Sequence, residues 1–145
     1  MRTLELHPLH PALAHFPLAF WIGASLCDLI ALKTHAPLWW TLSHHAMAAG
    51  LIAAVATVFA GLLELWLRHI PPKSRVWLLR HAILMGSAFL CFMVSLAWRV
   101  TIPPPQSAVI VGLAGTTIAL AGAYCGGALV YRYGVGVMWR PDDRR

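Results

Sequence analysis

Long apolar runs alternate with short polar breaks along the whole chain. A run can cross a bilayer as a helix when it has roughly 20 apolar residues, because each residue adds about 1.5 Å to the helix. Four runs meet this length, at about residues 16–32, 45–66, 80–99 and 108–131. The pattern predicts an all-α integral membrane protein with four spans.

The polar breaks are short and rich in proline, at Pro37, Pro71–Pro72 and Pro103–Pro105. Proline ends a helix because it lacks the backbone donor and disfavours helix in the residue before it. Short connections make neighbouring spans antiparallel. We therefore expect one domain over residues 1–145, folded as an up-down four-helix bundle, and we find no convincing internal repeat.

Composition agrees with lipid as the main solvent. Hydrophobic residues make up 59% of the chain and charged residues 11%, whereas about a quarter of the residues in soluble domains are charged. The first span lacks a basic leader and a small-residue cleavage site, so we expect it to be retained. Three cysteines fall in three different spans without a CxxC or CxxCH motif and are expected to be buried and unpaired: Cys27, Cys91 and Cys125.

The basic charge is concentrated in one connection. Arg68, Lys73, Arg75 and Arg80 lie between the second and third spans with no acid among them, whereas the other two connections carry one cation or none. Cytoplasmic loops of membrane proteins carry such an excess of Lys and Arg. This connection is therefore expected in the cytoplasm, with both termini on the same side. The net charge of +6 reflects topology, and no nucleic-acid partner is expected.

Small residues follow one face of the second span and one face of the fourth. In the fourth span Gly122, Gly126 and Gly127 belong to this pattern, which lets helix backbones approach closely in lipid. Packing within the chain explains such a face. A homodimer through the GxxxG motif from Gly122 to Gly126 is the alternative.

Charged residues near the span ends suggest two ion pairs. Arg99 closes the third span on the same helical face as His81, and Asp28 closes the first span at the same side of the membrane, so an Asp28–Arg99 pair would neutralise both. Glu64 and Arg68 are four residues apart on the second span, a spacing that favours pairing. We weigh a structural role for both pairs against a role in a proton or ion path.

Two histidines on different spans satisfy the depth requirement for b-type haem ligation. His15 and His81 lie about one turn inside the same leaflet. The helical phase raises a difficulty, because His15 and Asp28 are about 220° apart around a regular helix unless Pro17 kinks it. The alternative is a pair of interfacial histidines bonded to backbone or lipid phosphate.

A second histidine group precedes the first span. His7, His10 and His15 are separated by prolines and could bind copper or zinc, although the spacing is a weak metal signal.

Two motifs near the chain ends carry a resemblance to a known family. The run from His10 to Pro17, then Asp28, His81 and Arg99, and the glycine- and tyrosine-rich segment 126–137 resemble the bacterial membrane family of domain of unknown function 2231. The likeness covers nearly the whole chain and implies a four-helix inner-membrane protein. Relatives joined to Rieske-type or cytochrome c domains imply a redox setting. The resemblance marks these residues without giving them roles: His10, Pro11, His15, Pro17, Asp28, His81, Arg99, Gly126, Gly127, Tyr131 and Gly134.

Three functions remain open at this point. The first is a non-enzymatic membrane subunit or assembly partner of redox-complex subunits. The second is a b-type haem electron carrier with His15 and His81 as axial ligands, and the third is a small metal or proton permease. Nucleophilic hydrolysis and phosphate chemistry are disfavoured, because the chain shows neither a nucleophile elbow nor a P-loop.

Overall fold

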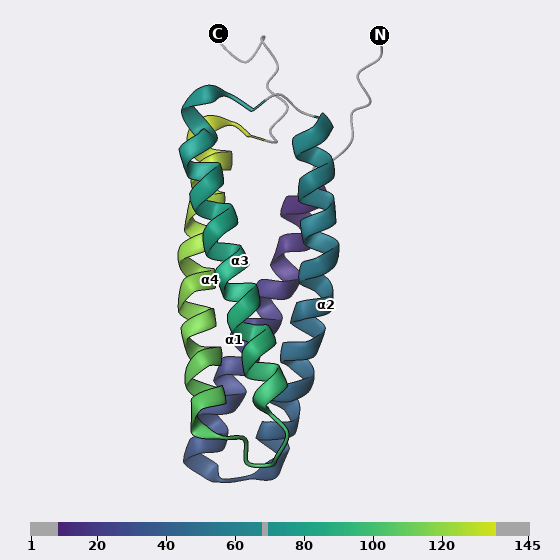
Figure 1. The fold of residues 1–145 in the computed structure, drawn as a ribbon, viewed down its shortest axis with the longest axis vertical. Coiled ribbons are helices and arrows are strands. Elements are labelled where there is room, and N and C mark those ends of the chain that lie inside the picture. The colour runs from purple at the N-terminus through teal and green to yellow at the C-terminus, as the bar shows by residue number, and fades with distance from the viewer. Residues whose placement is uncertain (1–8, 68–69, 136–145) are drawn as a thin grey trace, which may run out of the picture.

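The computed structural model describes residues 9–67 and 70–135, which fold into four long helices (Figure 1). Each helix is long and apolar enough to cross a membrane. The predicted all-α class with four membrane-spanning helices is confirmed. The elements are α1 (Leu9–Thr34), α2 (Pro37–Leu67), the short 3-10 helix η1 (Pro72–Ser74), α3 (Arg75–Trp98) and α4 (Gln106–Tyr133).

Several prolines mark where helices begin. Pro37 opens α2, Pro105 is the N-cap of α4, and Pro11 lies in the first turn of α1, where backbone N–H groups have no partner inside the helix. Pro17 lies inside α1 and is buried. Since α1 continues through Pro17, it begins at Leu9, earlier than the predicted span at residue 16, and it includes His10 and His15.

The helices run up and down, so the bundle has two distinct ends (Figure 1). One end holds the start of α1 and α3, the end of α2 and α4, and the connection through η1; we call it the basic end because Lys73, Arg75, Arg80 and Arg132 lie there. The opposite end holds the α1–α2 and α3–α4 connections; we call it the far end.

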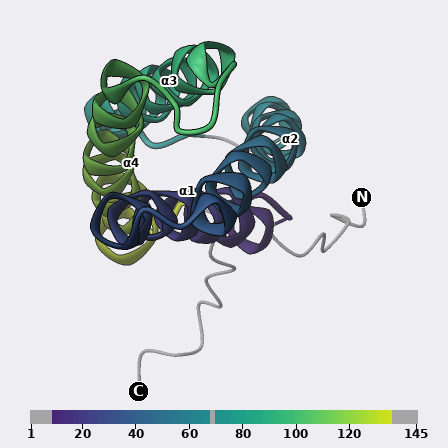
Figure 2. The ribbon, with the colours of Figure 1, turned by 90° about the horizontal axis from the view of Figure 1, so that it is seen from below.

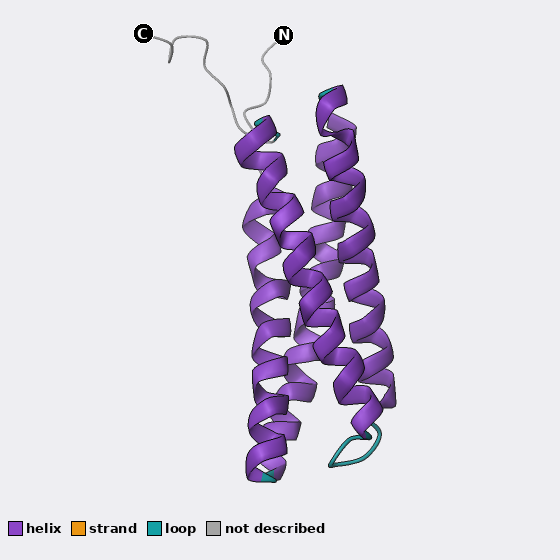
Figure 3. Ribbon diagram, turned by 90° about the vertical axis from the view of Figure 1, so that its left-hand side faces the viewer, coloured by secondary structure: helices purple, strands orange, loops and turns teal. Residues whose placement is uncertain are grey.

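The bundle consists of two helical hairpins, α1–α2 and α3–α4. Contacts are extensive within each hairpin and sparser between them. Figure 2 shows the four helices around a common centre, and Figure 3 shows the same helices from the side. Figure 1 shows α1 and α2 on one side of the basic end with α3 and α4 on the other. In the middle of the bundle the indole of Trp21 stacks on the ring of Phe92, with centroids 4.4 Å apart. This stack joins the hairpins in the core.

The outer surface of the bundle is apolar. Large side chains such as Ile52, Leu90 and Ile110 are more than half exposed, and every long helix has others like them. A soluble monomer rarely exposes so much apolar area. This surface therefore contacts the lipid bilayer, and the chain is a multi-pass membrane protein.

The two hairpins place matching residues at matching positions on α1 and α3. His10 meets His81, Trp21 meets Phe92 and Asp28 meets Arg99, and in every pair the partners are separated by 71 residues. The helices α1 and α3 run in the same direction (Figure 1). Such pairs are expected when two copies of one hairpin face each other across an approximate two-fold axis along the bundle.

The helices α2 and α4 repeat the relation with a constant offset of 65 residues. Gly50 lies against the Trp21 indole as Gly115 lies against the Phe92 ring, and Gly61 lies against His10 as Gly126 lies against His81. The expectation that the chain has no internal repeat is therefore wrong. The duplication is hard to see in the sequence because the spacing is kept while most side chains differ.

Candidate functional site

The histidine pair of His10 and His81 joins the two hairpins at the basic end. Their ring centroids are 6.0 Å apart and the ring planes are nearly perpendicular. Both residues are half-buried. Within the described part of the chain, this is the level nearest the basic end at which side chains of α1 and α3 meet as matching residues.

Each imidazole is held by the second helix of its own hairpin, α2 for His10 and α4 for His81. Nδ1 of His10 lies 2.9 Å from the carbonyl oxygen of Thr57, and Nδ1 of His81 lies 2.8 Å from that of Gly122. A carbonyl oxygen only accepts, so each Nδ1 carries a proton and donates it. In the neutral imidazoles Nε2 is left with a free lone pair.

Glycines let the rings lie close to α2 and α4. A Cβ atom at Gly61 would lie 2.7 Å from Nδ1 of His10, and one at Gly126 would lie 3.0 Å from Nδ1 of His81. In each hairpin the glycine follows the accepting carbonyl by one helical turn, since Thr57 precedes Gly61 and Gly122 precedes Gly126 by four residues. The two halves thus present their imidazoles in the same way.

Glu64 supports His10 from α2. Its Oε1 accepts a hydrogen bond of 3.0 Å from the backbone N–H of His10, one of the amides at the start of α1 that has no partner inside the helix. Arg68, the predicted partner of Glu64, lies outside the described residues. The structure thus gives Glu64 a role at the start of α1 that the sequence did not suggest.

His15 does not join this pair, which corrects the expected haem ligands. The side chain of His15 is exposed, and its Nδ1 lies 3.4 Å from the carbonyl oxygen of Ala12 in its own helix. Asp28 faces the interior instead. The phase difficulty is therefore resolved by His15 facing outward, and His10 takes the position opposite His81.

The expected metal group of His7, His10 and His15 is not assembled by the described residues. His7 lies outside them, and His10 faces α2 whereas His15 is exposed. Across residues 9–67 and 70–135 no cluster of three or more His, Cys, Asp or Glu side chains could hold a metal ion.

Asp28 and Arg99 meet at the far end. Nη1 of Arg99 donates to Oδ1 of Asp28 at 2.9 Å and Nη2 donates to Oδ2, so the pair is bidentate. The Asp28 side chain is fully buried and that of Arg99 nearly so. Nε of Arg99 lies 3.4 Å from Oγ of Ser95, which in turn donates to the carbonyl oxygen of Ala108 at 2.6 Å. The network links α1, α3 and α4.

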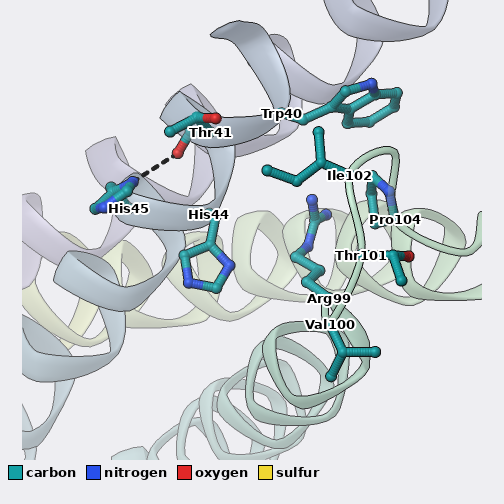
Figure 4. Close-up of a pocket in the computed structure, with 9 residues that line it drawn as sticks. All are labelled: Trp40, Thr41, His44, His45, Arg99, Val100, Thr101, Ile102 and Pro104. Atoms are coloured by element: carbon teal, nitrogen blue, oxygen red, sulfur yellow. Dashed lines mark hydrogen bonds between the residues drawn. The ribbon is translucent and has the colours of Figure 1, made fainter. Parts of the chain in front are cut away.

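A pocket of about 220 Å³ lies beside this pair (Figure 4). His44 and Arg99 line it, but the Arg99 guanidinium is already engaged by Asp28. His45 also lines the pocket, and its Nδ1 donates to the carbonyl oxygen of Thr41 in the same helix. The lining residues are Trp40, Thr41, His44, His45, Arg99, Val100, Thr101, Ile102 and Pro104.

The predicted packing glycines lie between α4 and α3. A Cβ atom at Gly122 would lie 2.7 Å from Sδ of Met85, and Gly126 faces His81. Gly127 has more room, since a Cβ there would meet only Tyr131 at 4.0 Å. The GxxxG face is therefore occupied within the chain, and a homodimer would have to form through another surface.

Comparison with known families agrees with this architecture. A family model described as "Predicted membrane protein (DUF2231)" matches residues 6–138. No curated protein matches the chain, and no solved structure matches it.

Proposed function

Because the chain belongs to this family of predicted membrane proteins, DUF2231, we propose that it is a non-enzymatic subunit of a redox assembly in the bacterial inner membrane. The observation that carries the proposal is the histidine pair, two imidazoles from different helices whose Nε2 atoms have no hydrogen-bond partner among the described residues. Imidazoles prepared in this way are typical ligands of redox metals. The chain would act by holding an electron carrier for its partner subunits.

The far end supports a scaffolding role. Asp28 and Arg99 neutralise each other across the two hairpins, so neither charge is left alone in a low-dielectric interior. The same pairing weakens the alternative of a proton or metal permease, since Asp28 is held by a guanidinium and His15 is exposed. Ion flux in proteoliposomes that is lost in His15→Ala would restore the permease.

The orientation follows from the basic end. Lys73, Arg75 and Arg80, in and just after the α2–α3 connection, favour the cytoplasmic side, and α1 begins and α4 ends at the same end of the bundle. We therefore propose that the histidine pair lies in the cytoplasmic half of the membrane and the Asp28–Arg99 pair in the opposite half.

Electron flow in membranes of the native host tests the function. Membranes from a strain that lacks the protein should transfer electrons from at least one physiological donor to the terminal acceptor more slowly. Wild-type protein should restore the rate, and His10→Ala should not. Equal rates for all donors, together with migration of the protein alone on native gels, would refute the proposal.

A further inference from the structure

The repeated spacing of the two hairpins places the histidine pair, one ring from α1 and one from α3, near the approximate two-fold axis. Deeper in the bundle, Trp21 stacks on Phe92 and the hydroxyls of Ser25 and Thr116 lie 2.6 Å apart. At the basic end α1 and α2 lie on one side and α3 and α4 on the other (Figure 1). A ligand bound between the two rings would therefore be shared by the hairpins.

The distance between the rings is too long for a direct hydrogen bond. Two imidazoles joined by a direct hydrogen bond have ring centroids at most roughly 5 Å apart, because the bonded nitrogens are about 2.9 Å apart and each lies about 1.1 Å from its ring centroid. When two imidazoles bind one first-row metal atom from opposite sides, their ring centroids lie up to roughly 6.3 Å apart, because each metal–nitrogen bond is about 2.0–2.1 Å long. With both Nε2 atoms turned toward the gap, the observed centroid distance of 6.0 Å would accommodate a single metal atom between the rings.

The number of protein donors narrows the kind of ligand. Zinc in proteins takes four ligands, and the described residues gather no third histidine, cysteine or carboxylate into a metal-binding group with His10 and His81. A haem brings four nitrogens of its own and needs two axial ligands. The chain has no CxxCH motif for covalent attachment, so the haem would be of the b type.

The basic end carries cations suited to the propionates of a haem. A flat macrocycle at right angles to the line between the rings would stand along the bundle axis, between the hairpins. Its propionates would reach the basic end, where Arg80 and Arg132 lie over the Trp77 ring at 5.5 and 5.9 Å from its centroid. Guanidinium groups are suited to carboxylates.

We propose that one b-type haem binds between the two hairpins, with Nε2 of His10 and Nε2 of His81 as its axial ligands. This inference rests on the proposed function and names the electron carrier. The hydrogen bonds to the Thr57 and Gly122 carbonyls orient the two ligands and raise their basicity, as second-shell partners do at other metal sites.

Spectroscopy of the full chain tests the assignment. The protein is expressed with a haem precursor supplied and purified in mild detergent, and haem, copper and zinc are quantified together. Wild type should hold about one haem per chain with a low-spin bis-imidazole spectrum. His10→Ala and His81→Ala should each lower haem content by more than about tenfold. The matched control His15→Ala removes an exposed imidazole and should leave the haem unchanged.

A second variant guards against simple misfolding. His81→Met keeps an axial ligand, and methionine–histidine ligation raises the reduction potential of a haem. The variant should therefore keep haem at a higher potential, a result that a merely structural histidine would not give. Helical content and thermal unfolding of each variant show whether the bundle is intact.

Three results would overturn the inference. One is wild-type protein that holds no haem although the precursor is supplied. Another is haem lost in His15→Ala and retained in His10→Ala. The third is copper bound at one atom per chain and lost in His10→Ala. Met85 lies one turn from His81, and its thioether is a soft ligand that copper accepts. Copper at the histidine pair would refute the haem assignment but not the proposed redox function. Unchanged electron transfer in host membranes that lack the protein would refute the redox function as well.

Discussion

Exchange of the buried charges tests the two-fold relation between the hairpins. Asp28→Asn or Arg99→Met alone leaves a buried charge without its partner. The structure shows two charge-assisted hydrogen bonds in the pair, each worth about 1.5–3 kcal/mol. Loss of one partner of a buried pair costs about 3–5 kcal/mol, so we expect each single variant to lower the free energy of unfolding by that amount.

The double variant Asp28→Arg/Arg99→Asp should recover most of this loss, because positions 28 and 99 are equivalent in the two hairpins. Its free energy of unfolding should remain about 1 kcal/mol below that of wild type. In wild type Arg99 also contacts Ser95, whereas the position on α1 that matches Ser95 is Ala24, which has no hydroxyl for the new arginine. Unfolding in lipid bicelles measures the three free energies. A double variant as unstable as the two single variants added together would refute the equivalence.

Three further predictions follow from packing and topology. Trp21→Ala should lower stability by about 3–5 kcal/mol, whereas Trp21→Phe, which copies Phe92, should cost less than about 1.5 kcal/mol in thermal unfolding; equal losses would contradict the stack. Gly115→Ala should destabilise by about 1–3 kcal/mol because its Cβ would lie 3.0 Å from α3, while Gly86→Ala has open space and should be neutral or stabilising; the opposite order would refute the packing. A reporter inserted beside Lys73 should be active only in the cytoplasm, and activity outside would reverse the orientation.

The sequence was sufficient to predict the fold. Apolar runs of spanning length and proline-rich breaks identify four helices, because a bilayer leaves little choice of structure. The inward face of α3 was also predictable from helical phase, and Ala88, Phe92 and Ser95 are buried on it. The same phase places Arg99 toward Asp28, and the structure brings the two together.

The partner of His81 could not be found in this way. Polar and proline residues surround His10 and place it ahead of the predicted first span, and only the early start of α1 brings it into the bundle. The usable signal was the repeated spacing, with an aromatic residue 11 positions and a charge 18 positions after each histidine. Steps of 11 and 18 residues return to nearly the same face of a helix, so the repeat identifies His10 instead of His15.

The duplicated hairpin also bears on how such a chain can arise and be divided. A segment with two crossings returns to the side of the membrane from which it started, so a tandem copy keeps its orientation without any change in flanking charge. An ancestral gene for one hairpin could thus have formed a symmetric dimer before fusion. Separate expression of residues 1–67 and 70–145 in one cell should then yield two fragments that associate, each contributing one imidazole.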